Sequence, residues 1–294
     1  MQTLTEIRAI LQQAGLRPAR RFGQNFLIDK NLMQQVLDLS ELAGDEVVLE
    51  VGPGTGSLTE ELLGIASRVV AVEIDRGLAE ALRQRLGEND RFTLLQCDVL
   101  ASKHAVDPRV HAALGPRAVM VANLPYNIAT PLVAQCLVDS WRASLGPAGE
   151  ATRFDRLTFT VQKEVAERIA AAPGSSAYGP ISILASLLGG ARLGAVLPAT
   201  AFWPRPEVAS QVVRVDFDAA AAATIANIDA LQGIISLAFA QRRKQIGSIF
   251  RRAPSSCNAP ALGKALDTAG VDPHSRAEQI PPEAFAAIAA AMEA

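Results

Sequence analysis

The chain has 294 residues, of which 49% are hydrophobic and 20% are charged, and its formal net charge is −2. A chain of this length can bury one large core and a smaller one, or two modest domains. The near-neutral charge argues against a protein that is basic over its whole surface, although it does not fix how the charges are distributed.

The cysteine, histidine and hydropathy patterns exclude several classes of protein. The three cysteines and three histidines show neither a CxxC pair nor metal-ligand spacing, so we expect no disulfide framework and no metal site. The apolar stretch 181–203 is interrupted by Arg192, Pro198 and glycines, which indicates buried core and not a membrane span. Since the N-terminus has no basic leader before an apolar run, we expect a cytoplasmic protein without a membrane partner.

Basic side chains gather in two segments, one near the start of the chain and one in the C-terminal part. The second segment, residues 242–252, contains no acidic residue. Both segments are candidate contacts for phosphate groups, and a solvated helix face is the alternative interpretation. The candidate residues are Arg17, Arg20, Arg21, Arg242, Arg243, Lys244, Arg251 and Arg252.

Short apolar runs alternate with helical patterns between residues 46 and 162. Runs this uniformly apolar are typical of strands that are covered on both faces, as in a parallel sheet flanked by helices. The pattern therefore predicts an α/β sheet. Strands are expected at Val47–Val51, Val69–Ile74, Phe92–Cys97, Val119–Leu124 and Leu157–Val161, and helices at Leu58–Leu63, Leu78–Leu86 and Pro131–Val138.

Two more strands are expected later in the chain, at Arg192–Leu197 and Gln211–Phe217, as a pair at one edge of the sheet. An alanine run follows Asp218, and the remaining residues show helical periodicity only. We therefore predict an α/β domain over residues 1–218, with an N-terminal arm at residues 1–30, and a helical domain over residues 219–294.

A glycine-rich loop follows the first predicted strand and precedes a helix. It runs from Glu50 to Gly56, with glycines at positions 52, 54 and 56. Glycines here allow a tight turn and a close approach of a ligand to the backbone, as in nucleotide sites. The dinucleotide pattern GxGxxG would place a glycine at Ser57, whereas GxGxG with an acid two residues earlier is the form found in methyltransferases.

Acidic residues stand at the ends of the next two strands. Glu73 ends the second strand, where a carboxylate can accept both hydroxyls of a ribose, and Asp98 lies at the end of the third, where it can accept from an adenine amine. Each acid alone could be a surface residue or a helix cap. Because the carboxyl ends of parallel strands meet at one edge of a sheet, the loop and the two acids together predict a nucleoside-type cofactor site.

Asn123-Leu124-Pro125-Tyr126 follows the fourth predicted strand. If the methyl group is transferred to an adenine amine, the site must activate a poor nucleophile, because the lone pair of that amine is delocalised into the ring. Two acceptors for the amine hydrogens would draw the nitrogen toward tetrahedral geometry and free its lone pair to face the sulfonium methyl group. The Asn123 side-chain oxygen and the Leu124 carbonyl suit this role, Pro125 keeps the strand end rigid, and Tyr126 can stack on a base. No strong general base is required, so catalysis would be mostly positioning. A plain turn after a buried strand is the alternative.

A series of further segments occurs in a fixed order along nearly the whole chain. These are RFGQNFL at 21–27, GPGTG at 52–56, EID at 73–75, NLPYN at 123–127, QKEV at 162–165, AYG at 177–179, FWPRPEVAS at 202–210 and RRK at 242–244. In these segments the sequence resembles the ribosomal RNA adenine dimethyltransferases, and within them the bacterial small-subunit enzymes.

The resemblance implies a Rossmann-like class I S-adenosylmethionine-dependent methyltransferase sheet with a small all-helical C-terminal domain. It also implies N6-dimethylation of two adjacent adenines in the 3′-terminal hairpin loop of 16S ribosomal RNA, in the small subunit or its precursor. We expect a monomer. The implied cofactor contacts are Asn25, Leu27, Gly52, Gly54, Glu73, Ile74, Asp98, Val99 and Asn123.

Two details concern the RNA substrate. By resemblance Phe202 would be a second aromatic face opposite Tyr126, so that a flipped adenine lies between two rings, and a core phenylalanine is the alternative. After Lys244 the family usually continues with threonine, an aliphatic residue and, two positions further on, asparagine, whereas this chain has Gln245, Ile246 and Ser248. That departure concerns the C-terminal RNA contacts and not the chemistry.

Three alternatives share parts of this pattern. A large-subunit 23S rRNA adenine methyltransferase of the macrolide-resistance type has the same fold and cofactor, but NLPYN, QKEV and the Phe-x-Pro-x-Pro stretch favour the small-subunit enzyme. A non-catalytic RNA-binding assembly or transcription factor would not need Glu73, Asp98 and Asn123. An NAD-dependent oxidoreductase is disfavoured by Ser57.

Overall fold

The computed structural model describes residues 1–19, 22–102, 105–145, 151–253 and 258–292. Contacts between residues in space divide the chain into two compact units. The first unit comprises Met1–Ala166 and Ala191–Phe217, and the second comprises Glu167–Gly190 and Asp218–Ala294. Residues 167–190, assigned from the sequence to the first domain, thus group with the second unit. A single boundary near residue 219 stays a prediction.

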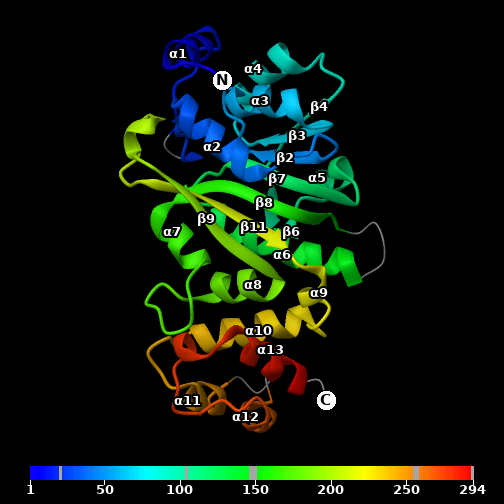
Figure 1. Ribbon diagram of the computed structural model, residues 1–294, viewed down its shortest axis with the longest axis vertical. Helices are drawn as coiled ribbons and strands as arrows, with labels where there is room; N and C mark the ends of the chain where they lie inside the picture. Colours follow the sequence, from blue (N-terminus) through cyan, green and yellow to red (C-terminus); the bar gives the residue numbers. More distant parts are fainter. Residues whose placement is uncertain (20–21, 103–104, 146–150, 254–257, 293–294) are drawn as a thin grey trace. The chain divides into compact units, whose positions relative to one another are not determined.

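A seven-stranded sheet forms the centre of the first unit (Figure 1). Its strands are β2 (Val47–Val51), β3 (Arg68–Glu73), β4 (Phe92–Gln96), β7 (Arg117–Asn123), β8 (Arg153–Gln162), β9 (Gly189–Leu197) and β11 (Ser210–Phe217). The order across the sheet is β4-β3-β2-β7-β8-β11-β9. The pairs from β4 to β8 are parallel, and β11 runs antiparallel to β8.

The predicted α/β sheet is confirmed, with all seven expected strands and with the two late strands, β11 and β9, at one edge. Strands β2 and β3 are buried over almost their whole length, as expected of parallel strands covered on both faces. Strand β8 begins at Arg153, four residues before the predicted start at Leu157. The prediction missed these residues because Arg153, Asp155 and Arg156 are charged and do not continue the apolar run. Arg153 pairs with Asp155, and these charged side chains hide the start of the strand from a search for apolar runs.

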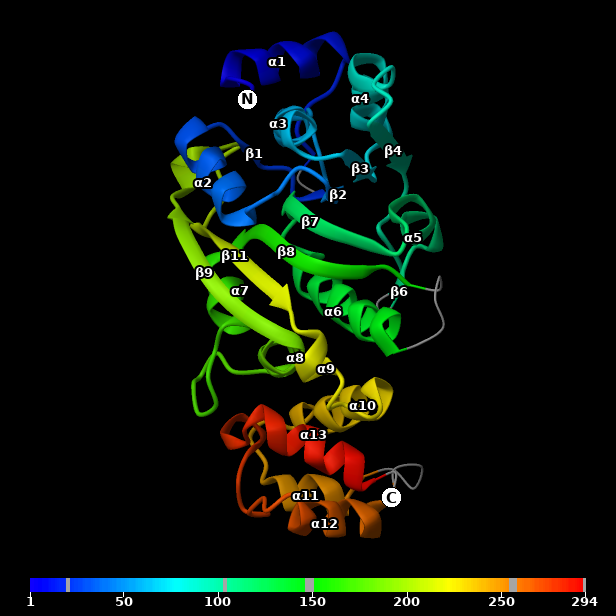
Figure 2. The ribbon, with the colours of Figure 1, turned by 45° about the vertical axis from the view of Figure 1, so that its right-hand side comes forward.

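Helices cover both faces of this sheet. They are α2 (Lys30–Ser40), α3 (Ser57–Ile65), α4 (Arg76–Leu86), α5 (Pro108–Leu114) and α6 (Ala129–Leu145), with α1 (Leu4–Gln13) before them and α7 (Lys163–Ile169) after β8. Figure 2 shows α2 and α3 on one face of the central strands and α5 and α6 on the other. The core between α2, α3 and the sheet includes Met33, Leu62 and Val119.

Two small sheets lie outside the main one. Strand β1 (Phe26–Leu27) pairs antiparallel with β10 (Phe202–Trp203), and β5 (Leu100–Ser102) pairs with β6 (Ala105–Val106). The ring of Phe26 stacks on that of Trp203, with centroids 6.2 Å apart, and the Arg8 guanidinium lies 5.1 Å from the Trp203 ring. This pairing joins the N-terminal arm to the proline-rich stretch, which the sequence did not predict.

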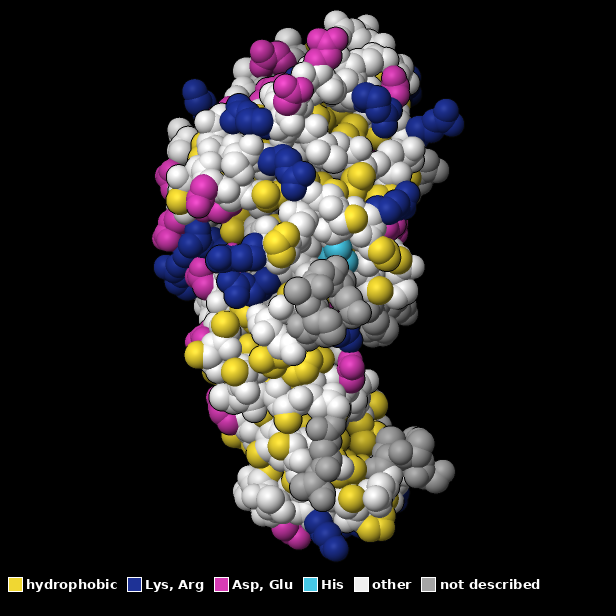
Figure 3. All heavy atoms as spheres, turned by 90° about the vertical axis from the view of Figure 1, so that its right-hand side faces the viewer, with side chains coloured by type: hydrophobic (Ala, Val, Ile, Leu, Met, Phe, Trp, Pro, Cys, Tyr) yellow, Lys and Arg dark blue, Asp and Glu magenta, His cyan; other side chains and the backbone are white. Residues whose placement is uncertain are grey.

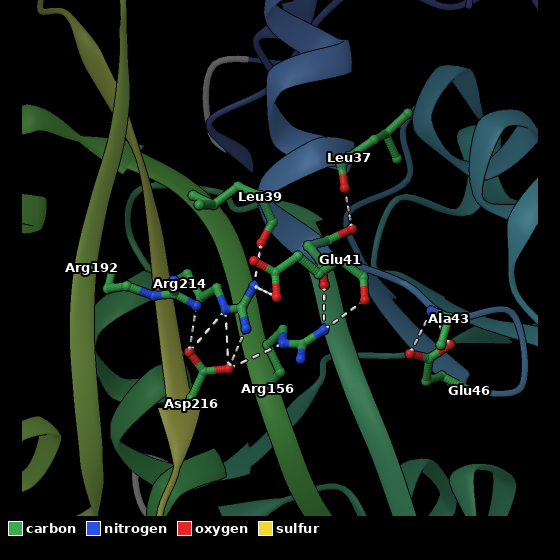
Figure 4. A network of polar contacts seen from close by, with 10 residues as sticks. Leu37, Leu39, Glu41, Ala43, Glu46, Arg156, Arg192, Arg214 and Asp216 are labelled. Carbon is green, nitrogen blue, oxygen red and sulfur yellow. Dashed lines mark hydrogen bonds and ion pairs between the residues drawn. The ribbon is translucent and has the colours of Figure 1, made fainter.

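The C-terminal end of α2 is held by arginines from the sheet (Figure 4). Arg214 and Arg156 donate to the backbone carbonyls of residues 39–41, at N–O distances from 2.6 to 2.9 Å. Asp216 in turn accepts from Arg156, Arg192 and Arg214. The last carbonyls of a helix have no partner inside the helix, so this network satisfies groups that would otherwise need water. It thereby fixes where α2 ends.

The second unit is built from helices. They are α8 (Pro180–Leu188), α9 (Ala219–Ala222), α10 (Ile228–Phe239), α11 (Ile246–Arg251), α12 (Ala259–Thr268) and α13 (Pro282–Ala291). Tyr178, from the AYG segment, is fully buried here and donates to the Ile280 carbonyl at 3.0 Å. Its ring packs near Phe239, which packs near Phe285. In the part of the chain that the structure describes, no helix combines the length and the apolar character needed to cross a bilayer.

Candidate active site

A cavity lies where the parallel strands β2, β3 and β7 reach their carboxyl ends. Its walls come from the N-terminal arm, the glycine loop, the ends of β3 and β4, the segment after β7, and Met33 of α2. All nine predicted cofactor contacts line it, and so do Asn123, Leu124, Pro125 and Tyr126 of the predicted catalytic set. The topology therefore brings together predicted residues from five separate segments.

The glycine loop needs its glycines for both conformation and space. Gly52 and Gly54 have φ angles of +71° and +60°, which residues other than glycine rarely adopt. A Cβ on Gly54 would lie 2.8 Å from Cε1 of Phe26, and one on Gly52 would lie 3.2 Å from Cγ of Pro125. The loop backbone is thus packed directly against the arm and against the segment after β7.

Glu73 is a buried carboxyl group at the cavity wall, with 4% of its surface exposed. It accepts from the backbone N–H of Asp75 at 2.9 Å and from that of Gly54 at 3.2 Å. Burial raises the pKa of Glu73 to about 7, and these backbone bonds oppose the rise. Donors from a ligand, such as two ribose hydroxyls, would favour the ionised form.

Glu50 lines the same cavity and was noted in the sequence only as the acid before the loop. It is 2% exposed and accepts a hydrogen bond of 2.6 Å from the Thr59 hydroxyl. Burial, aided by the negative charge of Glu73, raises the pKa of Glu50 to about 8 against the opposing effect of the Thr59 hydrogen bond. The cavity therefore contains a carboxyl group that is mostly protonated at neutral pH.

The ends of β3 and β4 bring polar and apolar groups to the cavity. Asp98 is exposed, and its Oδ1 accepts from the Leu100 N–H at 3.0 Å. Ile74 presents an aliphatic side chain that is 45% exposed, and Val99 lies buried beside Asp98. An adenine needs an apolar surface for its face and an acceptor for its amine. With Glu73 placed for a ribose, these residues fit the adenosine part of S-adenosylmethionine.

Asn123 ends β7 with its carboxamide held at both ends. Its Nδ2 donates to the Asn25 carbonyl at 2.9 Å, and its Oδ1 accepts from the Thr160 hydroxyl. Thr160 lies on β8 directly opposite Asn123 and is fully buried. No sequence pattern marks Thr160, because a threonine inside a buried strand carries no functional signal by itself.

Tyr126 is held through its hydroxyl. That oxygen lies 2.6 Å from Oγ of Ser210, at the start of β11, and Ser210 is fully buried. Burial raises the pKa of Tyr126 above its usual value, so the phenol stays protonated at neutral pH. Tyr126 lines the cavity, and its hydroxyl is anchored by Ser210.

Phe202 differs from the other predicted catalytic residues, since it is not among the residues that line the cavity. Its side chain is 3% exposed and belongs to the core formed with Leu27, Met33 and Leu197. The reason is the β1–β10 pairing, which sets Phe202 opposite Leu27. This arrangement favours the alternative interpretation of Phe202 as a core phenylalanine.

The predicted phosphate contacts are in different settings. Arg243 and Lys244 line a polar recess of the second unit together with Gln245, Ser248, His274 and Arg276. His274 and Arg276 come from the segment before α13 and were not predicted. Arg242 instead donates to the Ser176 carbonyl at 2.7 Å and pairs with Glu278 at 3.5 Å.

The remaining basic candidates that the structure describes do not line the recess of Arg243 and Lys244. Arg251 and Arg252 are exposed at the end of α11, and Arg17 is exposed in the first unit. Arg20 and Arg21 lie outside the described residues. On the face shown in Figure 3, Lys and Arg side chains are interspersed with Asp and Glu side chains over much of the surface. Where the structure describes the side chains, no group of three or more His, Cys, Asp or Glu residues is arranged to hold a metal ion.

Solved structures similar to this chain identify the class of protein. The 23S rRNA methyltransferase ErmE is 25% identical, with a TM-score of 0.60, and the match covers 92% of this chain and all of that one. A dimethyladenosine transferase from Plasmodium falciparum shares the fold, with a TM-score of 0.67 and 21% identity. That match covers 90% of this chain and 95% of the other. The fold of this chain is therefore that of a class I methyltransferase.

Sequence comparison identifies the family. The profile described as "Ribosomal RNA adenine dimethylase" matches residues 16–293. A relative from Phenylobacterium zucineum, named "Ribosomal RNA small subunit methyltransferase A", is 38% identical over 98% of this chain and 93% of its own length. One with the same name from Streptomyces griseus is 37% identical over 97% and 92%. This chain belongs to the ribosomal RNA adenine dimethylase family, which confirms the resemblance seen in the sequence.

Proposed function

We propose that this chain is an S-adenosylmethionine-dependent methyltransferase that dimethylates N6 of two adjacent adenines in the 3′-terminal hairpin loop of 16S rRNA during small-subunit maturation. The observation that carries the proposal is the position of Asn123–Tyr126 on the cavity formed by the glycine loop, Glu73 and Asp98. The names of the relatives that match nearly the whole chain support the choice of substrate. The proposal includes action as a monomer in the cytoplasm.

The cavity residues have distinct roles in holding the cofactor. Glu73 would accept the ribose hydroxyls, Asp98 the adenine amine, and Ile74 would cover one face of the adenine, while Gly52 and Gly54 let the backbone approach the ligand. Asn25, Leu27 and Val99 complete the wall. Bound there, S-adenosylmethionine supplies a methyl group on a positively charged sulfur.

Asn123 and Leu124 act on the target amine. The Asn123 Oδ1 and the Leu124 carbonyl would each accept one amine hydrogen, which draws the nitrogen toward tetrahedral geometry and directs its lone pair at the methyl group. Because the carboxamide of Asn123 is held from both ends, it is oriented before the substrate arrives. The proton released after transfer goes to water, and positioning supplies most of the rate.

Tyr126 provides the stacking surface for the base. Tyr126 lines the cavity, and the contact of its hydroxyl with Ser210 keeps the side chain in place. An adenine in a hairpin loop is unpaired, so it can be splayed out at low cost. Since Phe202 is buried in the core, the stacking that we propose rests on Tyr126 alone.

Basic residues of both units are proposed to hold RNA phosphates. Arg243 and Lys244 are the best placed, because they share a recess with His274 and Arg276, and the acid in that recess, Glu278, is paired with Arg242. Gln245 and Ser248, where the sequence departs from the family pattern, line the same recess. Neutral side chains there can donate hydrogen bonds to phosphate oxygens as well.

The test is mass spectrometry of unmethylated small subunits after incubation with the protein and labelled cofactor. We expect two adjacent dimethyladenosines in the 3′-terminal loop. In parallel, Asn123→Ala should abolish transfer while RNA binding stays nearly intact. Equal loss of both would contradict the role of Asn123.

Two outcomes would redirect the proposal. Label in large-subunit RNA instead would favour a 23S rRNA methyltransferase, and the likeness to ErmE is the one specific observation for that alternative. Primer extension on RNA from a deletion strain separates the two, because the proposal requires loss of the stops at the small-subunit loop. If calorimetry detected no binding of S-adenosylmethionine, a non-catalytic RNA-binding factor would replace the enzyme.

A further inference from the structure

Thr160 is a buried residue of β8 whose hydroxyl donates to Oδ1 of Asn123. The two residues are direct neighbours across the β7–β8 ladder. We infer that Thr160 is a positioning residue for the methyl transfer: it sets the direction of the Asn123 oxygen that receives a hydrogen of the target amine. The inference rests on the proposed function of Asn123.

The hydrogen-bond pattern leaves one orientation for the carboxamide. Nδ2 of Asn123 donates to the Asn25 carbonyl, which can only accept. Turning the carboxamide over would place its oxygen against that carbonyl oxygen, with no hydrogen between them. Oδ1 must therefore point toward Thr160, and Thr160 must be the donor in that contact. A carboxamide oxygen has two acceptor sites, so one stays for the substrate.

Without Thr160 the carboxamide would be held at one end only. The terminal torsion of an asparagine side chain is broad, so a single contact through Nδ2 does not fix the direction of Oδ1. Misplacement of a positioning group by about 1 Å can lower a rate by about 100-fold. Thr160 acts through Asn123 and does not line the cavity itself.

Thr158 offers a matched control in the same strand. It lies two residues before Thr160, on the same face of β8, and is equally buried. Within the described part of the chain, its hydroxyl has no hydrogen-bond partner. Thr158→Val and Thr160→Val therefore remove the same group from the same kind of site, and only the second change removes a contact to the active site.

The test compares these variants with wild type in steady-state transfer to unmethylated small subunits. We expect Thr160→Val to lower kcat by about 10–100-fold with KM for both substrates unchanged, Thr160→Ser to restore most of it, and Thr158→Val to match wild type. Equal kcat for the two valine variants would overturn the inference, and so would a loss in Thr160→Val that Thr160→Ser does not restore.

A second measurement needs no substrate. The 15N relaxation of the Asn123 side-chain amide should report a less ordered carboxamide in Thr160→Val and an unchanged one in Thr158→Val. An unchanged order parameter in both variants would contradict the inference. If wild-type protein transferred no methyl group to small subunits, the proposed function would fall, whereas an active wild type with an equally active Thr160→Val would overturn the positioning role alone.

Discussion

The buried carboxyl group of Glu50 should make the ligand-free protein less stable as the pH rises. Its pKa is raised by burial from 4.5 to about 8 in the folded protein. A group whose folded pKa is raised binds more protons in the folded state, so folding is favoured at low pH and stability is lost as the pH rises toward the folded pKa. For Glu50 that window extends from pH 4.5 to about 8.

Glu50→Gln removes this dependence while it preserves the shape and the acceptor for the Thr59 hydroxyl. Glu50 has a pKa of 4.5 in the unfolded chain and about 8 in the folded protein. By linkage, the free energy of unfolding of the wild type should fall by about 2–3 kcal/mol between about pH 5.5 and 7.5. The glutamine variant should lack this part of the loss. For a unit of this size the difference corresponds to about 5–10 °C in Tm.

The assay is thermal unfolding of both proteins without ligand at several pH values, followed by circular dichroism. Carboxyl groups that do not interact with Glu50 contribute equally to both proteins, so the difference between the two curves reports Glu50 together with its coupling to Glu73. We expect the stability of the variant relative to wild type to grow steadily up to pH 8. Parallel curves over the whole range would refute the reasoning, because they would mean that Glu50 has an ordinary pKa in the folded protein.

Three further changes follow from the geometry of the site and of α2. Gly54→Ala should weaken binding of S-adenosylmethionine by at least about 10-fold in calorimetry, because alanine is strained at the φ angle of this position and its Cβ would meet the Phe26 ring. Gly64→Ala is the control: a Cβ there meets no atom within 4 Å, so binding should stay unchanged. Tyr126→Ala should lower kcat/KM for the small subunit by about 10-fold or more through lost stacking; an unaltered value would contradict the role of the ring. Arg214→Gln should lower the free energy of unfolding by about 1–3 kcal/mol, since Arg214 is 4% exposed and the change removes its charge-assisted hydrogen bonds to Asp216 and to the Leu39 carbonyl. Arg192→Gln, at a residue that is 55% exposed, should cost little in the same denaturant titration.

The strands and the position of the site were predictable from sequence because they depend on local patterns. The central strands β2 and β3 are apolar runs of the length that a sheet covered on both faces requires. The glycine loop and the acids Glu73 and Asp98 follow successive strands, and parallel strands end at a common edge. Their convergence on one cavity therefore followed from topology alone.

The orientation of individual side chains was decided only by the tertiary structure. Asn123 is held by Asn25 and Thr160, which are 98 and 37 residues away in the chain. Phe202 belongs to a motif that resembles a substrate contact, yet the pairing of β10 with β1 places it in the core.

The physical reason is that periodicity specifies which face of an element is buried, but not which group from a distant segment lies across from it. The sequence by itself determined that Asn123 ends a buried strand beside a nucleotide-type loop. Only the packing of β8 and the N-terminal arm against β7 decided where the oxygen of that side chain points.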